Sequence, residues 1–434
     1  MSNVSRRAFI KAFGLAAVAG TGLFGASAQA QRRAAAHVVI LGGGIGGSTA
    51  AKYTRIMNPD VRITLIEQNA AYITCPRSNE VITGHFTLDD LTFDYETIKS
   101  RFDVDVIIDR VVGVDPDRRE VRTQGGERVS YDRLVVSPGI DFRYEEIEGY
   151  TAEVAETRMP HAWKAGPQTL LLKRQLEALP QGGTVLIAPP QNPFRCPPGP
   201  YERSSLITEW LAQHNPRAKV LILDPKDRFT KDVPFKKGWE RLYGYGTEHS
   251  RIEWISGSQG GRVLSVDPER MTVEAENGMH RADLVNIIPP QKAGKLAFDI
   301  GLVDQTGWCP VDRATFKSTQ LDDIHVIGDS AVCDAMPKSG YSANSHAKLV
   351  AHVIRAELSG FDPVVPTWAN TCYSLVGSDY GVSISDVFEL RDGLIQKVPD
   401  SGAVSPVTDN PAQPLLESVY LKNWHRTFVK DVFS

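Results

Sequence analysis

The sequence predicts an α/β protein with two parallel sheets, followed by a smaller C-terminal α+β domain. Two strand–helix–strand patterns, beginning near residues 37 and 183, predict the parallel sheets. After about residue 361, Pro and Gly separate short stretches of alternating apolar residues, such as residues 381–384, which favours antiparallel strands. A chain of 434 residues is long enough for two or three such domains.

Composition and charge exclude several classes of protein. The chain is 42% hydrophobic and 23% charged, which is typical of a globular protein rather than a disordered one. Its 48 basic residues are balanced by 52 acidic ones, so there is no general electrostatic reason to expect a nucleic-acid partner. No strongly apolar run of about 18 residues follows residue 30, so we expect no integral membrane segment in the mature chain.

Residues 1–30 predict a twin-arginine signal peptide. Arg6 and Arg7 precede a weakly apolar stretch rich in Gly and Ala, and residues 28–30, Ala-Gln-Ala, predict a cleavage site. A short amphipathic N-terminal helix is the alternative. The signal predicts a periplasmic protein that is exported by the twin-arginine route, into an oxidising compartment that permits disulfides.

The mature chain begins with a pattern that favours binding of a dinucleotide. Residues 37–41 predict an apolar strand, and a helix-like segment follows the glycine-rich turn. The G-x-G-x-x-G pattern of this turn is filled by Gly42, Gly44 and Gly47. These glycines permit a tight turn, close approach of the backbone to a pyrophosphate, and packing of helix on strand. The next strand ends in Glu67, whose carboxylate suits the hydroxyls of a ribose. A plain glycine-rich turn is the alternative.

Two later segments indicate that the dinucleotide is FAD. Residues 131–139 resemble the strand and turn by which flavoproteins with two dinucleotide-binding domains leave their first domain. Residues 324–329 resemble the late motif of these proteins, which ends here in Gly328 and Asp329; the Asp contacts the ribityl and pyrophosphate region of the flavin. The fold implied is that of the glutathione-reductase-like flavoproteins, with an FAD-binding domain made of residues 31–160 and 300–360.

The intervening domain, residues 161–299, resembles an NAD-binding domain without a nucleotide site. A strand at residues 183–188 and a helix at residues 202–214 are present, but the loop between them, residues 189–200, is rich in proline where glycines are needed. Prolines lack the N–H groups that bind a phosphate, and their rings obstruct the tight path of a glycine loop. We therefore expect no second dinucleotide and an electron donor other than NADH or NADPH.

The five cysteines form no C-x-x-C pair and indicate no metal site or covalent haem. Two of them attract attention. Cys196 stands where the nucleotide loop has been replaced, and Cys333 follows Asp329 by four residues. In a fold of this kind both segments meet near the flavin ring, where a disulfide would accept two electrons from a small thiolate nucleophile. A structural disulfide or two unrelated buried thiols are the alternatives.

Three cysteine-containing segments together resemble the flavoprotein subunit of flavocytochrome c sulfide dehydrogenase. They are residues 72–79 (Tyr-Ile-Thr-Cys-Pro-Arg-Ser-Asn), residues 194–202 (Phe-Arg-Cys-Pro-Pro-Gly-Pro-Tyr-Glu) and residues 328–333 (Gly-Asp-Ser-Ala-Val-Cys). This resemblance implies an FAD-dependent enzyme that oxidises sulfide in the periplasm. It also implies a heterodimer in which the electrons pass to a separate cytochrome c subunit, which alone carries haem c.

The resemblance assigns roles to individual residues. It implies that Cys75 carries an 8α-S-cysteinyl bond to FAD, that Cys196 and Cys333 form the redox disulfide, and that Trp424 lies beside the flavin. Residues 361–434 would cover the flavin and take part in docking the cytochrome. Cys309 and Cys372 receive no role.

Two other functions are weighed against this one. A sulfide:quinone oxidoreductase has a related fold, but it typically needs an apolar or amphipathic face near its C-terminus, and residues 415–434 are mixed in character and short. The second alternative is a non-catalytic, exported flavin electron-transfer module whose disulfide is only structural.

Overall fold

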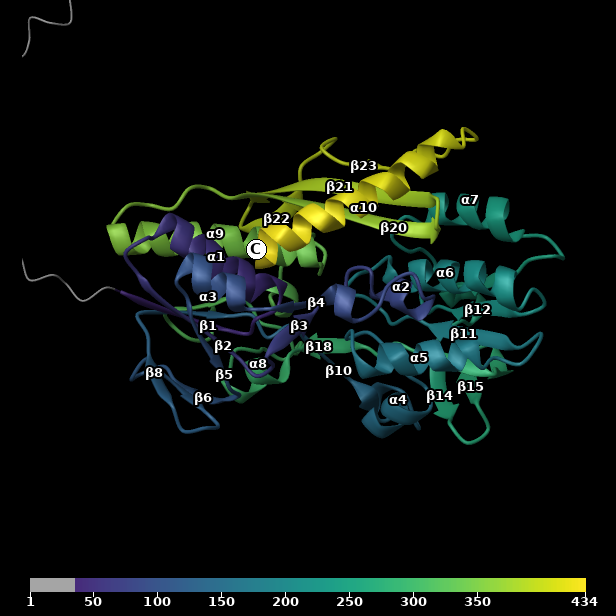
Figure 1. The fold of residues 1–434 in the computed structure, drawn as a ribbon, viewed down its shortest axis with the longest axis horizontal. Coiled ribbons are helices and arrows are strands. Elements are labelled where there is room, and N and C mark those ends of the chain that lie inside the picture. The colour runs from purple at the N-terminus through teal and green to yellow at the C-terminus, as the bar shows by residue number, and fades with distance from the viewer. Residues whose placement is uncertain (1–35) are drawn as a thin grey trace, which may run out of the picture. The chain divides into compact units, whose positions relative to one another are not determined.

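The computed structural model describes residues 36–434, so the predicted signal peptide and its cleavage site lie outside the described residues. Within the described part, two parallel sheets lie beside each other, and a C-terminal layer lies across both (Figure 1). The predicted α/β class, with two sheets of the dinucleotide-binding type and a C-terminal sheet-containing domain, is confirmed.

The first sheet has five parallel strands in the order β19-β9-β1-β2-β5. The central strand is fully buried from Val38 to Leu41, because a parallel sheet is covered on both faces and its strands are apolar throughout. Its strands are β1 (His37–Leu41), β2 (Arg62–Glu67), β5 (Asp105–Ile108), β9 (Arg133–Val136) and β19 (Ile324–Val326). The sheet thus joins a strand that lies late in the chain to four that lie early.

Helices α1 (Ile45–Met57) and α9 (Gly340–Ser359) pack together on one side of this sheet. Buried residues of α9, including Ala347 and Val350, belong to the same core as the sheet. An antiparallel three-stranded sheet supplies Val121 and Val129 to this core. It consists of β6 (Val111–Asp115), β7 (Glu120–Thr123) and β8 (Arg128–Ser130).

The second sheet has four parallel strands in the order β13-β12-β11-β17. Its strands are β11 (Thr184–Ala188), β12 (Lys219–Leu223), β13 (Ile252–Ile255) and β17 (Leu284–Ile287). The helices beside it are α5 (Pro167–Glu177), α6 (Gly199–His214) and α7 (Asp232–Tyr243). They form a second core around fully buried Phe235 and Trp239.

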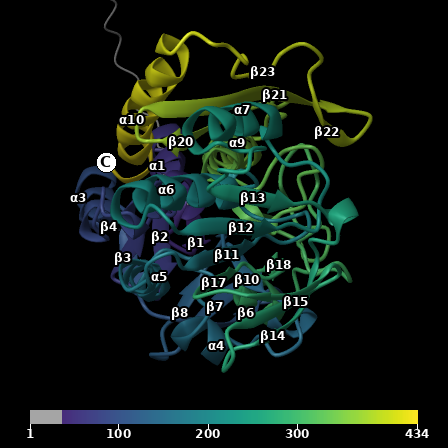
Figure 2. The same ribbon diagram turned by 90° about the vertical axis from the view of Figure 1, so that its right-hand side faces the viewer.

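The C-terminal layer consists of an antiparallel sheet and one long helix. The strands are β20 (Thr367–Gly377), β21 (Tyr380–Arg391), β22 (Leu394–Lys397) and β23 (Ala403–Val404), and the helix is α10 (Ala412–Phe433). Strand β20 contacts α9 on the side of the first sheet and α6 on the side of the second, and Figure 2 shows the layer above both. The layer therefore connects the two halves of the molecule.

The end of α10 is fastened to α1. The Lys52 ammonium donates hydrogen bonds to the carbonyl oxygens of Lys430, Asp431 and Ser434, at 3.3, 3.0 and 2.5 Å. Because the last carbonyls of a helix have no partner within the helix, a buried cation is a favourable cap for them. The Asp431 carboxylate also accepts a hydrogen bond from Tyr53.

Short elements connect these layers. Strand β10 (Ile140–Phe142) pairs with β18 (Gln291–Ala293) where the chain passes between the two parallel sheets. The remaining elements are β3 (Ala71–Ile73), α2 (Ser78–Ile82), β4 (Thr92–Asp94), α3 (Glu96–Phe102), α4 (Ala152–Thr157), β14 (Val263–Asp267), β15 (Thr272–Ala275), β16 (Gly278–Arg281) and α8 (Lys295–Asp299). We keep the domain boundaries 31–160 with 300–360, 161–299 and 361–434 as a proposal.

Candidate active site

The turn after β1 requires glycine at two positions, Gly42 and Gly47, because a side chain there would collide with the backbone. Gly42 has φ +96°, and a Cβ there would lie 2.5 Å from the carbonyl oxygen of Ser137. A Cβ on Gly47 would lie 1.7 Å from the carbonyl oxygen of Gly42, so this glycine allows α1 to pack on the strand. Gly44 is the N-cap of α1 and supplies no capping side chain, which leaves the first amides of the helix free for an anion.

Glu67 lies at the end of β2, beside this turn. One of its carboxylate oxygens accepts a hydrogen bond from the backbone N–H of Gly43 at 2.7 Å, and the other accepts one from the N–H of Asn69 at 2.9 Å. The carboxylate is therefore held at the open side of the glycine turn.

A cavity of about 720 Å³ begins at this turn. Its volume lies in the range of sites for cofactors and other small molecules. It is lined by Gly42, Gly44 and Glu67, and also by Cys75, Cys196, Cys372 and Trp424. Asp329 and the N-terminus of α9, at Gly340 and Tyr341, lie on its wall. Five segments that are far apart in the sequence thus share one cavity.

The residues on the cavity wall fit FAD. One carboxylate oxygen of Asp329 is buried without a hydrogen-bond partner in the protein, and so is the indole N–H of Trp424. Buried polar atoms are almost always paired, so these two require partners from a bound molecule with hydroxyl and carbonyl groups. The unpaired amides at the start of α1 suit its pyrophosphate. A flavin dinucleotide offers all three kinds of group.

Trp424 is held in place by stacked aromatic rings. Its ring stacks on Phe428 with 5.0 Å between centroids, and Phe428 stacks on Tyr341 at 6.1 Å. Tyr341 belongs to α9 and the other two belong to α10, so the stack fixes α10 against the helix whose N-terminus faces the cavity.

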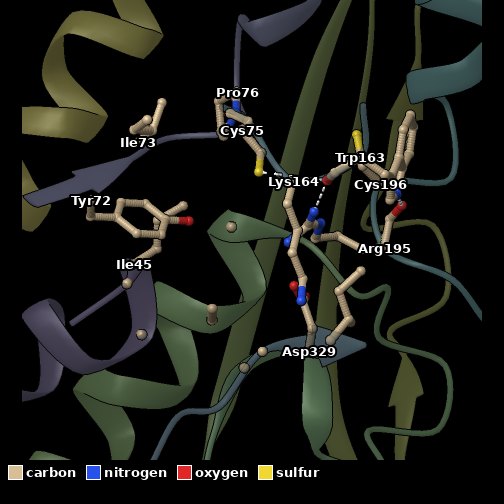
Figure 3. Close-up of a pocket in the computed structure, with 18 of the residues that line it drawn as sticks. Ile45, Tyr72, Ile73, Cys75, Pro76, Trp163, Lys164, Arg195, Cys196 and Asp329 are labelled. Carbon is tan, nitrogen blue, oxygen red and sulfur yellow. Dashed lines mark hydrogen bonds between the residues drawn. The ribbon is translucent and has the colours of Figure 1, made fainter. Parts of the chain in front are cut away.

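Cys75 lies on the turn between β3 and α2, and its sulfur points into the cavity (Figure 3). The backbone N–H of Ser78 donates to the carbonyl of Cys75 at 2.9 Å, which fixes this turn before the helix starts. The thiol has only a long contact, 3.9 Å, with the carbonyl oxygen of Trp163. The guanidinium of Arg195 donates to the same carbonyl. The sulfur is therefore fixed in position but has no strong partner of its own.

Cys196 lies in the proline-rich loop between β11 and α6. It has φ +56°, an uncommon conformation for a residue with a side chain, and the loop maintains it with two backbone hydrogen bonds. Its N–H donates to the carbonyl of Lys338 at 2.8 Å, and its carbonyl accepts from the N–H of Gly199 at 2.8 Å. A Cβ on Gly199 would lie 3.0 Å from the Cys196 sulfur and 2.7 Å from the ring of Trp163, so the sulfur needs a glycine there.

The partner of Cys196 is Cys372, on strand β20. The two thiols share a hydrogen bond, and all five cysteines are free in this structure. The hydrogen bond to Cys372 and burial raise the pKa of Cys196. The pKa of Cys372 is lowered by the hydrogen bond from Cys196, and further by Lys231 and by a hydrogen bond from Ser374. The two thiols therefore interact closely, and the cations Lys231, Arg195 and Arg203 lie near the pair.

The prediction that Cys196 pairs with Cys333 is wrong for this structure. Cys333 is buried in the core of the first sheet, and its thiol donates to the carbonyl of Ala331 at 3.5 Å. The prediction relied on distance along the chain from Asp329. After that residue the chain pairs Ala331 with Cys309 and turns into the core, so the side chain of Cys333 does not line the cavity.

Sequence reasoning missed Cys372 and two charged groups beside the pair, Lys231 and Glu202. A signal for Cys372 was present: Asn370, Cys372 and Ser374 alternate along one strand and so share a face. Glu202 lies at the cavity wall, deep in the protein, and burial raises its pKa to about 7. It accepts hydrogen bonds of 2.8 Å from Asn79 and from the N–H of Leu375.

The second sheet offers no free carboxylate to bind the ribose of a second nucleotide. Asp224 follows β12, the position at which such a domain places its ribose-binding acid. Its carboxylate is fully buried and accepts hydrogen bonds from Tyr201, Trp254 and Lys226, at 2.5, 3.0 and 2.7 Å. The N-terminus of α6 contributes Gly199 to the cavity that holds the cysteine pair.

Neither a metal centre nor a membrane span is present in the described residues. Between residues 36 and 434, no group of three or more His, Cys, Asp and Glu side chains is arranged to hold a metal ion. Over the same residues, each helix is too short or too polar to cross a membrane.

Family models match three parts of the chain. Residues 36–167 match the pyridine nucleotide-disulphide oxidoreductase family. Residues 169–289 match the central part of the sulfide dehydrogenase [flavocytochrome c] flavoprotein chain, and residues 364–433 match the flavin-binding part of flavocytochrome c sulphide dehydrogenase.

Individual relatives agree with these models. The flavoprotein chain of sulfide dehydrogenase [flavocytochrome c] from Chlorobaculum thiosulfatiphilum is 50% identical over 45 residues, which are 10% of this chain and 94% of that sequence. The sulfide-quinone reductase of Aquifex aeolicus is 24% identical over 392 residues, covering 84% of this chain and 87% of that protein. The structure of the sulfide:quinone oxidoreductase from the same organism superposes with a TM-score of 0.70 at 19% identity, covering 92% of each chain.

The fold and the site define an FAD-dependent oxidoreductase of the pyridine nucleotide-disulphide type. The two relatives just described are a sulfide-quinone reductase and the flavoprotein chain of a sulfide dehydrogenase, and in this chain two cysteines, Cys196 and Cys372, line the cavity that fits FAD. The chain belongs to the family of flavocytochrome c sulfide dehydrogenase flavoprotein chains.

Proposed function

We propose that the chain oxidises hydrogen sulfide with Cys196 and Cys372 as its redox-active pair, FAD as its cofactor and a cytochrome c subunit as its electron acceptor. The observation that supports this best is the facing pair of thiols on the wall of the cavity that the glycine turn and Asp329 also line. When bound, FAD supplies a two-electron acceptor that releases electrons one at a time.

The cysteine pair performs the first chemistry in this proposal. In the oxidised protein the two sulfurs form a disulfide, and hydrosulfide opens it by thiol–disulfide exchange. Glu202, with its pKa raised by burial to about 7, gains or loses a proton close to neutral pH beside the reacting sulfur. Arg203 hydrogen-bonds the backbone carbonyls of His161 and Ala162 and so keeps the wall of the cavity rigid.

We further propose that Cys75 forms a thioether with the 8α carbon of the flavin and that Trp424 covers the ring. The free position of the Cys75 sulfur in the cavity and the unpartnered indole N–H of Trp424 support these assignments. Covalent attachment suits a protein that leaves the cytoplasm, and the twin-arginine pattern at Arg6 and Arg7 supports export to the periplasm.

Anaerobic titration with sulfide tests the reaction. Purified protein without a partner should lose its oxidised-flavin absorbance when sulfide is added, and Cys196→Ser and Cys372→Ser should not respond. The matched control is Cys333→Ser, which removes a buried thiol outside the cavity and should respond as the wild type does. An unresponsive flavin in the wild type would instead indicate a non-catalytic electron-transfer module.

A quinone is the second candidate for the electron acceptor. Residues 415–434, described above as mixed and short, lie almost entirely in the 22-residue helix α10. Four apolar side chains on this helix are each 42–46% exposed: Leu415, Leu416, Val419 and Tyr420. These side chains lie close along the helix to Leu421, which lines the cavity. Reduction of soluble cytochrome c and of decylubiquinone by sulfide, each with the same protein preparation, distinguishes the two acceptors.

A further inference from the structure

Three basic side chains near the cysteine pair have no carboxylate partner: Arg195, Arg203 and Lys231. Among the ion pairs of residues 36–434, none includes any of the three, whereas the nearby Lys226 ammonium pairs with Asp224 at 2.7 Å. Arg203 is 1% exposed and Lys231 is 5% exposed. An uncompensated charge is strongly unfavourable inside a protein, so a group of opposite charge is expected close to them.

Two of these cations are held by neutral oxygen atoms. The guanidinium of Arg203 donates to the side-chain oxygens of Asn79 and Asn286, both at 3.0 Å, and otherwise to backbone carbonyls. The ammonium of Lys231 donates to the backbone carbonyl of Cys372 at 3.2 Å, and its other two acceptors are also uncharged. The hydrogen bonds of both side chains are therefore satisfied, but their positive charges are not balanced.

Arg195 lines the cavity and keeps most of its N–H groups free. A guanidinium has five N–H donors, and within residues 36–434 its one hydrogen bond goes to the carbonyl oxygen of Trp163. The backbone N–H of Arg195 donates separately to the side chain of Gln291 at 2.8 Å, which fixes the residue. The Cys75 sulfur contacts the same Trp163 carbonyl, and Figure 3 shows the guanidinium beside that sulfur. The remaining N–H groups are therefore available to a molecule in the cavity.

Trp163 connects both arginines with the cysteine pair. The guanidinium carbon of Arg203 lies 4.9 Å from the centroid of the Trp163 ring. A Cβ on Gly199 would lie 2.7 Å from this ring and 3.0 Å from the Cys196 sulfur, so the ring and the sulfur are close neighbours. Arg195 directly precedes Cys196, and its carbonyl accepts a hydrogen bond from the Trp163 indole at 3.1 Å. The positive groups therefore surround the pair.

The carboxyl groups of Glu202 and Asp329 also lie near these cations. Burial raises the pKa of Glu202 to about 7, so this carboxyl is only partly ionised at neutral pH, and burial raises the pKa of Asp329 as well. A fourth cation, the ammonium of Lys338, donates to the backbone carbonyl of Asp329 at 2.7 Å. Four positive groups thus face at most two negative ones, and this part of the cavity is positive.

The oxidised cysteine pair supplies no charge to balance them. In the proposed reaction the two sulfurs form a neutral disulfide before sulfide arrives. Sulfide near neutral pH is a mixture of H₂S and HS⁻, and the anion alone is attracted by positive charge, most strongly where water is excluded. The anion is also the form that attacks a disulfide. The unbalanced cations therefore match the reactive form of the substrate.

We infer that the cavity contains an anion-binding pocket at the cysteine pair, in which Arg195 supplies the free N–H donors and sulfide is bound as hydrosulfide. This inference rests on the proposed function for the identity of its substrate. In the exchange, a bond forms between the sulfur of HS⁻ and one cysteine sulfur, and the Cys196–Cys372 bond breaks. The electron pair of the broken bond stays on the other cysteine as a thiolate, while the first carries a persulfide with the proton of HS⁻. One negative charge enters and one remains, so the same cations stabilise the bound substrate and the product of this step.

Two alkylating reagents of nearly equal size and different charge test the pocket without turnover. In the full-length holoprotein, with the Cys196–Cys372 pair reduced under argon, labelling by iodoacetate, an anion, and by neutral iodoacetamide is followed by peptide mass spectrometry. The ratio of the two rates cancels the reactivity of the thiol and measures the attraction of the reagent's charge. This ratio should be about tenfold higher in the wild type than for the neutral model thiol N-acetylcysteinamide.

Variants of Arg195 assign the effect. Arg195→Gln keeps a donor for the Trp163 carbonyl and removes the charge, so its ratio should fall close to that of the model thiol, and Arg195→Lys should restore most of the difference. The matched control is Lys226→Gln, which removes a buried cation that is paired with Asp224 and does not line the cavity. Its ratio should equal that of the wild type. A wild-type ratio equal to that of the model thiol, or an unchanged ratio in Arg195→Gln, overturns the inference.

Bromide provides a second measurement, which needs neither a reactive thiol nor a folded variant. Crystals of the wild-type holoprotein are soaked in sodium bromide, and the anomalous signal of bromide should appear in contact with the Arg195 guanidinium. No bromide there overturns the inference, also where neither reagent labels the pair. If the pocket binds bromide but sulfide does not bleach the wild-type flavin, the proposed function fails and the anion-binding pocket stands. If sulfide bleaches the flavin and the pocket shows no preference for anions, only the inference fails.

Discussion

The sulfur of Cys196, in the loop that follows the first strand of the second sheet, faces the sulfur of Cys372 on strand β20 of the C-terminal layer. The loop after β11 and the strand β20 thus contribute one sulfur each to the pair that we propose as redox-active. A cysteine pair of this kind depends on the packing of β20 against α6, which is a tertiary contact rather than a local motif.

The first prediction separates the three cysteines by their effect on sulfide oxidation. Cys196→Ser and Cys372→Ser should abolish bleaching of the flavin by sulfide, because neither variant can form the disulfide that hydrosulfide opens. Cys333→Ser should retain it and lose about 1–2 kcal/mol of stability, since it places a hydroxyl in an apolar core. Stopped-flow absorbance and urea unfolding measure the two effects. Loss of sulfide response in Cys333→Ser alone would contradict the structural pairing.

The second prediction concerns attachment of the flavin. Cys75→Ser should fold with nearly unchanged stability, because the thiol is half-buried and has only a 3.9 Å contact with a carbonyl oxygen. After acid precipitation, the yellow colour should stay in the pellet for the wild type and move to the supernatant for the variant. Cys309→Ser, which alters a fully buried cysteine in the core, is the control and should keep its colour in the pellet. Flavin that remains attached in Cys75→Ser would refute the assignment.

The third prediction is that NADH and NADPH do not reduce the flavin at useful rates. The Asp224 carboxylate, at the position of a ribose-binding acid, is already engaged by Tyr201, Trp254 and Lys226. Addition of stoichiometric NADH under argon, followed at the flavin absorbance maximum, should produce no rapid change. Sulfide added afterwards to the same cuvette is the positive control.

The fourth prediction follows from the raised pKa of Glu202. Burial raises this pKa from 4.5 to about 7, so between these values the folded protein holds a proton that the unfolded chain releases. The contribution of the protonated Glu202 carboxyl to the stability of the fold is therefore fully present below about pH 4.5, and it is lost as the pH rises through about 7. Relative to wild type, Glu202→Gln should therefore gain about 2–3 kcal/mol of stability between pH 5 and pH 8.5, measured by urea unfolding.

Glu357→Gln provides a control of opposite sign for this experiment. Burial alone would raise the pKa of Glu357, but hydrogen bonds from Lys317 and Arg133 lower it overall. Its contribution is present above the unfolded pKa and is lost as the pH falls, so Glu357→Gln should be most destabilised at neutral pH. Parallel pH trends in the two variants would show that the Glu202 carboxyl is not the cause.

The glycine turn and the acid after β2 could be predicted because their constraints are local. Gly42 needs a positive φ, Gly47 must approach Gly42 closely, and Glu67 follows them within the same strand–helix–strand unit. The argument from the proline-rich loop is local as well, because a proline lacks the N–H that binds a phosphate, and the expected lack of a second dinucleotide stays a prediction.

Cys372 and Lys231 could not be predicted in this way. The side chain of Cys372 reaches Cys196 only because β20 lies against α6, and Lys231 reaches Ser374 only because the segment before α7 meets the same strand. The prediction that Cys333 lies beside the flavin failed for the opposite reason, because it relied on closeness along the chain. Cys333 is close in sequence to Asp329, but the direction of the chain after Ala331 places its side chain in the core.

The closing of the cavity by α10 has a consequence for biosynthesis. Leu421 and Trp424 complete a wall that begins at Gly42, and the Lys52 cap holds the end of that helix in place. A nascent chain on the ribosome still lacks this wall, however well its first sheet has folded. A chain that stops short of α10 therefore offers the flavin an incomplete cavity, even when both parallel sheets have folded.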